Sequence, residues 1–215
     1  MKKLFLSIIP IFFILSGFCQ ELQPVKLDND VTVSLFPGYQ KKDTLNQSTW
    51  SANALDGYMI VIRQENVKGN APLKKASDLN NVLKTYVKGI QAESANSVAL
   101  NVRDTTVGQL KAKVFTLKSD NGGDITLRDF LLLYTQDATY TFQYVYTNNT
   151  QLYAKKEGKA FFSSVRTGPD MTWTDQYQSR VTGLSPINKI EIFGGGVMVL
   201  ILVIVLVTRK KPAIG

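Results

Sequence analysis

The stretch LKAKVFTLKSDNGGDITLRDFLLLYTQDATYTFQYVY, residues 110–146, decides the fold class of this 215-residue chain. It contains three largely apolar runs that are separated by two short polar turns, at 119–124 and 136–138. The third run places an aromatic ring at every second position, from Tyr140 to Tyr146. An alternation of period two is typical of a strand that buries one face. Because short turns join strands that run in opposite directions, this stretch predicts an antiparallel sheet.

A helix is predicted on the N-terminal side of this sheet. Ser77 is a favourable N-cap residue, and Asp78 suits the first turn of a helix. One apolar face follows at helical spacing, formed by Leu79, Val82, Leu83, Tyr86, Val87 and Ile90. A second helix is predicted over 151–165, where Thr150 can cap its start and Gly168-Pro169 stops it.

Further strands are predicted over 31–36, 49–54, 58–63 and 98–104, from their apolar or alternating patterns. Asp56-Gly57 separates two of them and is a strong signal for a hairpin turn. The order is then strands, helix, four strands and helix. This order predicts an α+β domain, an antiparallel sheet packed by two helices.

The N-terminal residues 1–19 have the pattern of a secretory signal peptide. Lys2 and Lys3 precede an apolar run, and small residues lead to a predicted cleavage after Cys19. A lipoprotein is the alternative, because Cys19 follows a hydrophobic run. Phe18, however, stands where a lipobox needs a small residue. The sequence leaves open whether Cys19 is removed or lipidated.

The C-terminal end predicts one transmembrane helix over 190–208. Its core, 192–207, has no charged or polar side chain, and a basic tail follows at 209–215. Positive charge after a span favours a cytoplasmic tail, so the domain over 20–168 is predicted outside the cytoplasm. Residues 169–189 are interpreted as a tether, whose Trp173 and Tyr177 could contact the domain or the interface. A processed C-terminal sorting signal is the alternative for this end.

The composition argues against several classes of function. The formal charge is +8, but five of the basic residues, Lys2, Lys3, Arg209, Lys210 and Lys211, lie in the two ends. The remainder holds 20 basic and 17 acidic residues, and no nucleic-acid partner is expected. The chain has no histidine and one cysteine, which excludes Ser-His-Asp and Cys-His catalytic groups and the usual zinc sites. We expect neither an enzyme nor a cofactor.

The tyrosine-rich strand is the first candidate binding site. Tyr134, Tyr140, Tyr144 and Tyr146 could form an aromatic face for a glycan or a peptide. The alternative is that these rings pack under a helix or across strands, as strand aromatics commonly do.

Three other patterns have a functional and a structural interpretation. The turn 120–124, DNGGD, could hold calcium or could simply be a hairpin loop. Asp28 and Asp30 could be paired catalytic carboxylates or a solvated strand entry. A basic stripe could face anionic lipid or only water, and it consists of Lys155, Lys156, Lys159 and Arg166.

The arrangement over 30–168 resembles the PsbP-like and DcrB-like families of small exported α+β proteins. The resemblance is carried by VTVSLFPGY at 31–39, STWSANALDGYMIVIRQ at 48–64, the helix before the run of strands, and KEGKAFFSSVRTG at 156–168. It implies a non-enzymatic accessory or binding domain at the outer face of a membrane, and it brings no catalytic residues. The signal sequence also resembles those of exported proteins of the Bacteroidota.

The function predicted from these patterns is that of a membrane-anchored interaction domain in the bacterial envelope, with a protein or envelope partner. A small-ligand-binding domain that uses the tyrosine face is the first alternative. An enzyme that uses carboxylates or a Ser-Lys pair is the second.

Overall fold

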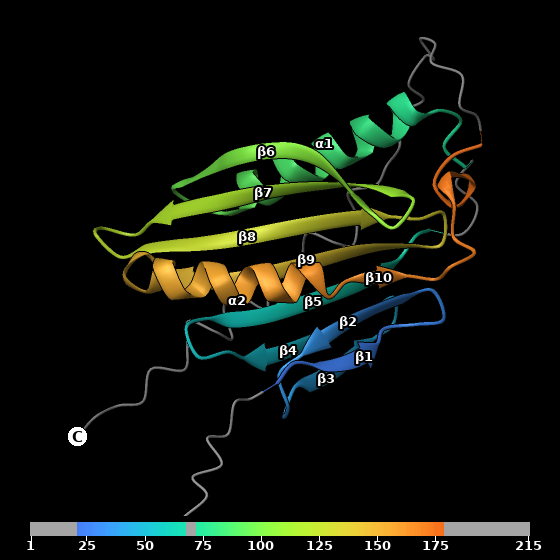
Figure 1. Cartoon of the computed structure of the whole chain (residues 1–215). Helices are drawn as coiled ribbons and strands as arrows, with labels where there is room; N and C mark the ends of the chain where they lie inside the picture. Colours follow the sequence, from blue (N-terminus) through green and yellow to red (C-terminus); the bar gives the residue numbers. More distant parts are fainter. Residues whose placement is uncertain (1–20, 68–71, 179–215) are drawn as a thin grey trace, which may run out of the picture.

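Seven antiparallel strands form the central sheet of the computed structural model, which describes residues 21–67 and 72–178 (Figure 1). Their order across the sheet is β3-β4-β5-β9-β8-β7-β6. The bounds are β3 Gln40–Thr44, β4 Gln47–Asn53, β5 Tyr58–Glu65, β6 Ser97–Val107, β7 Leu110–Asp120, β8 Ile125–Tyr134 and β9 Ala138–Thr147. The stretch that decided the fold class therefore forms three neighbouring strands, β7, β8 and β9, as predicted.

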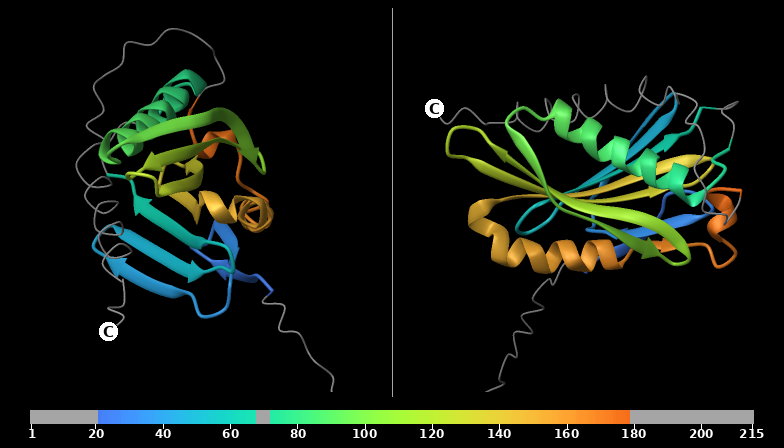
Figure 2. Two further views of the ribbon diagram at one scale, coloured as in Figure 1. Left: turned by 90° about the vertical axis from the view of Figure 1, so that its left-hand side faces the viewer. Right: turned by 90° about the horizontal axis from the view of Figure 1, so that it is seen from above.

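A second, three-stranded sheet has the order β1-β2-β10, with β1 Gln23–Lys26, β2 Val31–Leu35 and β10 Arg166–Thr167. This small sheet and helix α2, Gln151–Ser163, pack on one face of the central sheet. Helix α1, Ala76–Glu93, packs on the opposite face, as the left view of Figure 2 shows. Short 3-10 turns cover Asn148–Thr150 and Trp173–Asp175.

The alternation along each strand divides the apolar side chains between two cores. In β8, Leu131 and Leu133 point to the core that α2 and β2 close, whereas Phe130 and Leu132 point to the core under α1. Phe115 stacks on Phe130 with ring centroids 4.5 Å apart. The sheet is thus covered on both faces, which confirms the α+β class with two packed helices.

Three strands were not predicted, and each lacks a buried alternating pattern. All five residues of β3 are exposed, and β1 buries a single residue, Val25. The two residues of β10 pair with Thr32 and Val31 of β2. These strands form because they pair with a neighbouring strand, and their own sequences carry no strand pattern. The predicted strands and helices otherwise differ from the structure mainly at their ends.

The predicted cap of α1 is wrong, and that of α2 is right in position but lacks the side-chain bond. Helix α1 begins one residue before Ser77, and its cap is Lys75, whose backbone N–H donates to the Asp78 carboxylate (3.1 Å). Thr150 is the N-cap residue of α2, but its hydroxyl accepts no N–H from the first turn and donates to the carbonyls of Asp56 (3.1 Å) and Thr147 (3.3 Å).

Residues 169–178, which were interpreted as part of the tether, belong to the domain. Trp173 and Tyr177 pack against the core under α1. The Gln176 amide is fully buried: it accepts the N–H of Lys111 and donates to the carbonyls of Lys111 and Tyr134, each at 2.8 Å. These bonds fasten the segment to β7 and β8.

Strand β6 is a long edge of the central sheet and is interrupted by a β-bulge between Leu100 and Arg103. Asn101, inside the bulge, has a left-handed φ of 54°. The other edge, β3, is short and carries Lys41 and Lys42.

Within residues 21–67 and 72–178, no helix is long and apolar enough to cross a membrane. The predicted signal peptide (1–19), transmembrane helix (190–208) and basic tail (209–215) lie outside the described residues.

Candidate functional site

Strand β9 presents Tyr140, Phe142, Tyr144 and Tyr146 on one face, toward α2 and the small sheet. All four rings are buried. Phe161 of α2 packs against this row, with ring centroids 6.4 Å from Phe142 and 6.5 Å from Tyr144. The row exists because β9 lies near the middle of the sheet, between β5 and β8, where a helix covers it.

Each of the three tyrosine hydroxyls donates to a carboxylate on another element. Tyr140 donates to Asp28 (2.5 Å), Tyr144 to Glu157 (2.5 Å) and Tyr146 to Asp129 (3.2 Å). The three acceptors come from the β1–β2 turn, from α2 and from β8. We call these three pairs the tyrosine–carboxylate row.

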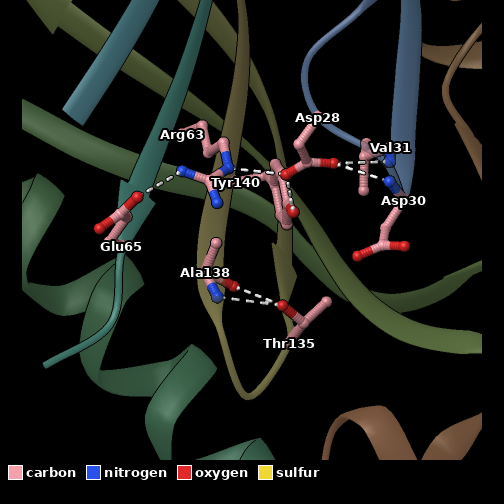
Figure 3. Close-up of polar contacts among 8 residues, drawn as sticks. All are labelled: Asp28, Asp30, Val31, Arg63, Glu65, Thr135, Ala138 and Tyr140. Atoms are coloured by element: carbon pink, nitrogen blue, oxygen red, sulfur yellow. Dashed lines mark hydrogen bonds and ion pairs between the residues drawn. The ribbon is translucent and has the colours of Figure 1, made fainter. Parts of the chain in front are cut away.

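Asp28 is the most fully bonded of the three carboxylates (Figure 3). Its Oδ2 accepts from Tyr140 and from Nε of Arg63 (2.6 Å), and its Oδ1 accepts the N–H groups of Asp30 (3.0 Å) and Val31 (2.9 Å). Arg63 also donates to Glu65 (3.3 Å). Asp28 therefore joins the small sheet to β5 and β9.

Burial and hydrogen bonding shift the pKa values of Asp28, Tyr140 and Tyr144. Burial acts to raise the pKa of Asp28, but the hydrogen bonds from Tyr140, Arg63 and two backbone N–H groups outweigh it and lower the pKa. Burial, followed by the bonds to the carboxylates, raises the pKa of Tyr140 and Tyr144 well above the ordinary value. Near neutral pH the phenols stay protonated and Asp28 stays ionised. Asp28 therefore acts as a hydrogen-bond acceptor that ties together the elements around it.

The four tyrosines of the candidate binding face do not share a surface. Tyr134 lies opposite Thr139 on the α1 side of the sheet, whereas Tyr140, Tyr144 and Tyr146 lie on the α2 side. The latter three rings are in the core, which is the packed arrangement that was the structural alternative. Their hydroxyls find acceptors within the domain, a feature that strand periodicity alone could not indicate.

Two of the acidic patterns serve the local backbone. The carboxylate of Asp120 accepts the N–H of Gly123 (3.1 Å) in the β7–β8 turn, where Gly122 and Gly123 have φ values of 79° and 111°. The carboxylate of Asp28 accepts the N–H of Asp30, and Figure 3 shows the carboxylate of Asp30 pointing away from it. In the part of the chain that the structure describes, no three His, Cys, Asp or Glu residues are placed to hold a metal ion.

An open groove lies beside the C-terminal end of α1 and the start of β6, with a volume of about 640 Å³. It is lined by residues that include Lys88, Gln91, Ser94 and Val98. The Ser94 hydroxyl is buried and has no hydrogen-bond partner. The groove is shallow and mixed in polarity, and it does not adjoin the tyrosine–carboxylate row.

The basic stripe is divided between two elements. Lys155, Lys156 and Lys159 are exposed on the outer face of α2. Arg166 lies in β10, where its guanidinium donates to the carbonyls of Ser163 and Val165.

No known family model matches the chain, and no curated protein is similar to it in sequence. Among solved structures, LpqN, involved in cell envelope biogenesis of Mycobacterium tuberculosis, is 11% identical over 69% of this chain and 91% of its own, with a TM-score of 0.45. A Bacteroides thetaiotaomicron protein is 9% identical over 65% of this chain and 46% of its own, with a TM-score of 0.40. Protein PA94 of unknown function from Pseudomonas aeruginosa is 9% identical over 64% of this chain and 91% of its own, also with a TM-score of 0.40. The family of the chain stays open, and its resemblance to the PsbP-like and DcrB-like families remains a prediction.

Proposed function

We propose that this chain is an exported, membrane-anchored domain of the bacterial envelope that acts by binding a partner and not by catalysis. The observation that carries the proposal is a group of three strongly exposed apolar side chains at one end of the domain. Leu55 and Leu152 are each 79% exposed, and Tyr153 is 66% exposed. Grouped exposed apolar residues commonly mark an interaction surface.

Two hydrogen bonds bring these three side chains to the same end of the domain. The N–H of Asp56 donates to Glu157 of α2 (3.2 Å), and the Thr150 hydroxyl donates to the carbonyl of Asp56 (3.1 Å). The β4–β5 turn, which holds Leu55, is thereby fixed to the start of α2, which holds Leu152 and Tyr153 (left end of Figure 1). We call these three residues the apolar tip.

The two alternatives find less support. A ligand site on the tyrosine strand requires rings that a ligand can reach, and three of the four rings are buried. Carboxylate chemistry requires an acid and a base that exchange protons near neutral pH, whereas Asp28 is held ionised by four hydrogen bonds.

The predicted location is tested in intact cells with a membrane-impermeant maleimide. Leu45, in the β3–β4 turn, is 99% exposed and suits a Leu45→Cys label in a Cys19→Ser chain. We expect labelling of intact cells. Labelling that appears only after lysis would place the domain in the cytoplasm and overturn the proposal.

The binding role is tested by photo-crosslinking in the same cells. A photoreactive phenylalanine at Tyr153 should crosslink to a defined partner or to lipid, and the same group at Leu45, beyond the other end of β4, should not. Equal and diffuse crosslinking at both positions would remove the apolar tip as a binding surface.

A further inference from the structure

We propose that the apolar tip and the outer face of α2 dock together on an anionic lipid surface. This inference rests on the proposed location at the outer face of the membrane and names the partner of that surface. The occupant is a bilayer that contains anionic phospholipid headgroups.

Helix α2 has two faces of opposite character. Ala154, Gly158 and Phe161 are buried and follow one another at helical spacing against the core. Leu152, Lys156 and Lys159 follow at the same spacing on the outer side, and all are exposed. Lys155 flanks this outer row. The outer side of α2 therefore places exposed lysines beside an exposed apolar end, while the apolar face of the helix packs on the core.

The lysines of α2 are free of acidic partners on their own face. In the described parts of the chain, the ion pairs are those of Lys41, Arg63 and Lys113, and none includes Lys155, Lys156 or Lys159. Glu157 is the single acidic residue of the helix, and it turns inward to accept from Tyr144 and from the N–H of Asp56. Internal bonding of Glu157 thus leaves a cationic outer face.

The acidic residues of a neighbouring turn limit where the docking face can extend. The acidic turn between β7 and β8, with Asp120 and Asp124, lies at the same end of the sheet as the apolar tip, because Thr126 pairs with Thr147 just before α2. An anionic surface would be repelled by that turn. The docking face therefore runs from the apolar tip along α2 and not across the end of the sheet.

The shape of this surface favours lipid over a folded protein partner. The apolar tip consists of side chains that stand out from a turn and a helix end, and the groove of the described domain is lined by other residues. Protruding apolar side chains can enter the headgroup region, while lysine stems bring their charges to the phosphates without fixed geometry.

The position of Gln178, the last described residue, is compatible with an orientation in which α2 lies along the membrane. Gln178 donates its N–H to Leu73 (2.9 Å) near the β8–β9 turn, at the end of the sheet opposite the apolar tip. The predicted tether beyond it, 179–189, can reach about 35–40 Å when extended. A ten-residue strand such as β8 spans about 33 Å. The tether is thus long enough for the domain to lie with α2 along the membrane.

The test uses the full chain with Cys19→Ser, reconstituted in lipid nanodiscs. A nitroxide is attached at Leu152→Cys, and the matched control carries it at Leu45→Cys, an exposed leucine at the opposite end. The discs contain phosphatidylcholine alone or an equal mixture with phosphatidylglycerol. Accessibility to oxygen and to a water-soluble nickel chelate measures whether each label lies in lipid or in water.

We expect the ratio of oxygen to nickel accessibility at position 152 to rise severalfold in anionic discs and not in neutral discs, with no change at position 45. Reversing three charges on α2, with Lys155→Glu, Lys156→Glu and Lys159→Glu, should abolish the rise. The same charge change at three lysines on α1 and just before it, with Lys74→Glu, Lys84→Glu and Lys88→Glu, should preserve it. Circular dichroism checks that both triple variants fold.

Three results would overturn the inference, and each has a different meaning. A label at position 152 that stays in water in both kinds of disc excludes docking on anionic lipid. A label that is shielded only in native membranes, and not in protein-free lipid, identifies a protein partner and leaves the proposed function standing. Failure of the intact-cell labelling at Leu45→Cys removes the proposed location itself.

Discussion

Tyr144 and Glu157 are joined by a hydrogen bond of 2.5 Å from the phenol to the carboxylate. The same oxygen of Glu157 accepts the N–H of Asp56. One carboxylate therefore connects β9, α2 and the β4–β5 turn. This connection ties α2 to the sheet and to the turn that holds Leu55 of the apolar tip.

Removing the Tyr144 hydroxyl tests this connection. Tyr144→Phe keeps the ring but leaves Glu157 with one fewer donor, and we expect the free energy of unfolding to fall by about 1.5 kcal/mol. Urea denaturation of the variant measures the change. Tyr153→Phe is the control, because Tyr153 is exposed at the surface and should have no measurable effect. Equal stability of the two variants would show that the Tyr144–Glu157 bond contributes nothing.

Two glycines lie close to the Tyr144 ring and should respond differently to a methyl group. A Cβ at Gly57 would lie 2.6 Å from the carbonyl oxygen of Val145 and 2.8 Å from the ring, so Gly57→Ala requires backbone movement. A Cβ at Gly158 would meet only the ring, at 3.3 Å, and would add helix propensity. We expect Gly57→Ala to cost about 3 kcal/mol and Gly158→Ala about 1 kcal/mol or less. Thermal unfolding of both variants measures which is less stable. A Gly158→Ala variant less stable than Gly57→Ala would contradict the contact distances at the two glycines.

Stability in acid should depend on Asp28. Its pKa is lower in the folded chain than in the unfolded chain, so the stabilisation is present above the unfolded value of about 4 and is lost as pH falls through the folded value. Asp28→Asn should lower the free energy of unfolding by about 2 kcal/mol at neutral pH. The difference in this free energy between the variant and the wild type should become smaller below about pH 4. Asp30→Asn is the matched control, since that side chain is exposed. If the difference in unfolding free energy between variant and wild type stays constant from neutral to acid pH, the lowered pKa of Asp28 does not contribute to stability.

Stability in alkali should depend on the buried phenols. The pKa of Tyr140, Tyr144 and Tyr146 is raised by burial and then by the nearby carboxylates. The stabilisation is therefore complete below the unfolded value of about 10 and is lost as pH rises toward the folded values. Ultraviolet titration at about pH 10 should find fewer phenolates in the native protein than in the protein unfolded in urea. Identical titration curves in the two states would contradict the burial of these hydroxyls.

The elements that could be predicted from the sequence are those whose own side chains alternate or repeat. The apolar face of α1 is an example, since Leu79, Val82, Leu83, Val87 and Ile90 are all buried. Strand β3 could not be found in this way, because its residues are all exposed and its pairing with β4 defines it. The burial of Gln176 could not be predicted either, because a single buried amide leaves no repeating pattern in the sequence.

The candidate site was predictable only in part. The alternation along β9 identified the aromatic row, but the acceptors lie 112, 13 and 17 residues from Tyr140, Tyr144 and Tyr146. Tertiary packing alone brings these residues together. The apolar tip has a faint sequence signal, an apolar Leu55 directly before the turn residues Asp56-Gly57. The lysines of α2 were recognised, but the inward turn of Glu157 was not.

The bulged edge of β6 has a consequence for the proposed anchoring of the domain at a membrane. Confinement crowds neighbouring copies, and an open, regular strand edge would then allow sheets of different molecules to join into fibres. The left-handed Asn101 interrupts the row of free backbone groups on β6, and the short strand β3 carries Lys42 beside the Lys41–Asp43 ion pair. In the proposed anchored state, these interruptions should hinder pairing between the sheet edges of neighbouring copies.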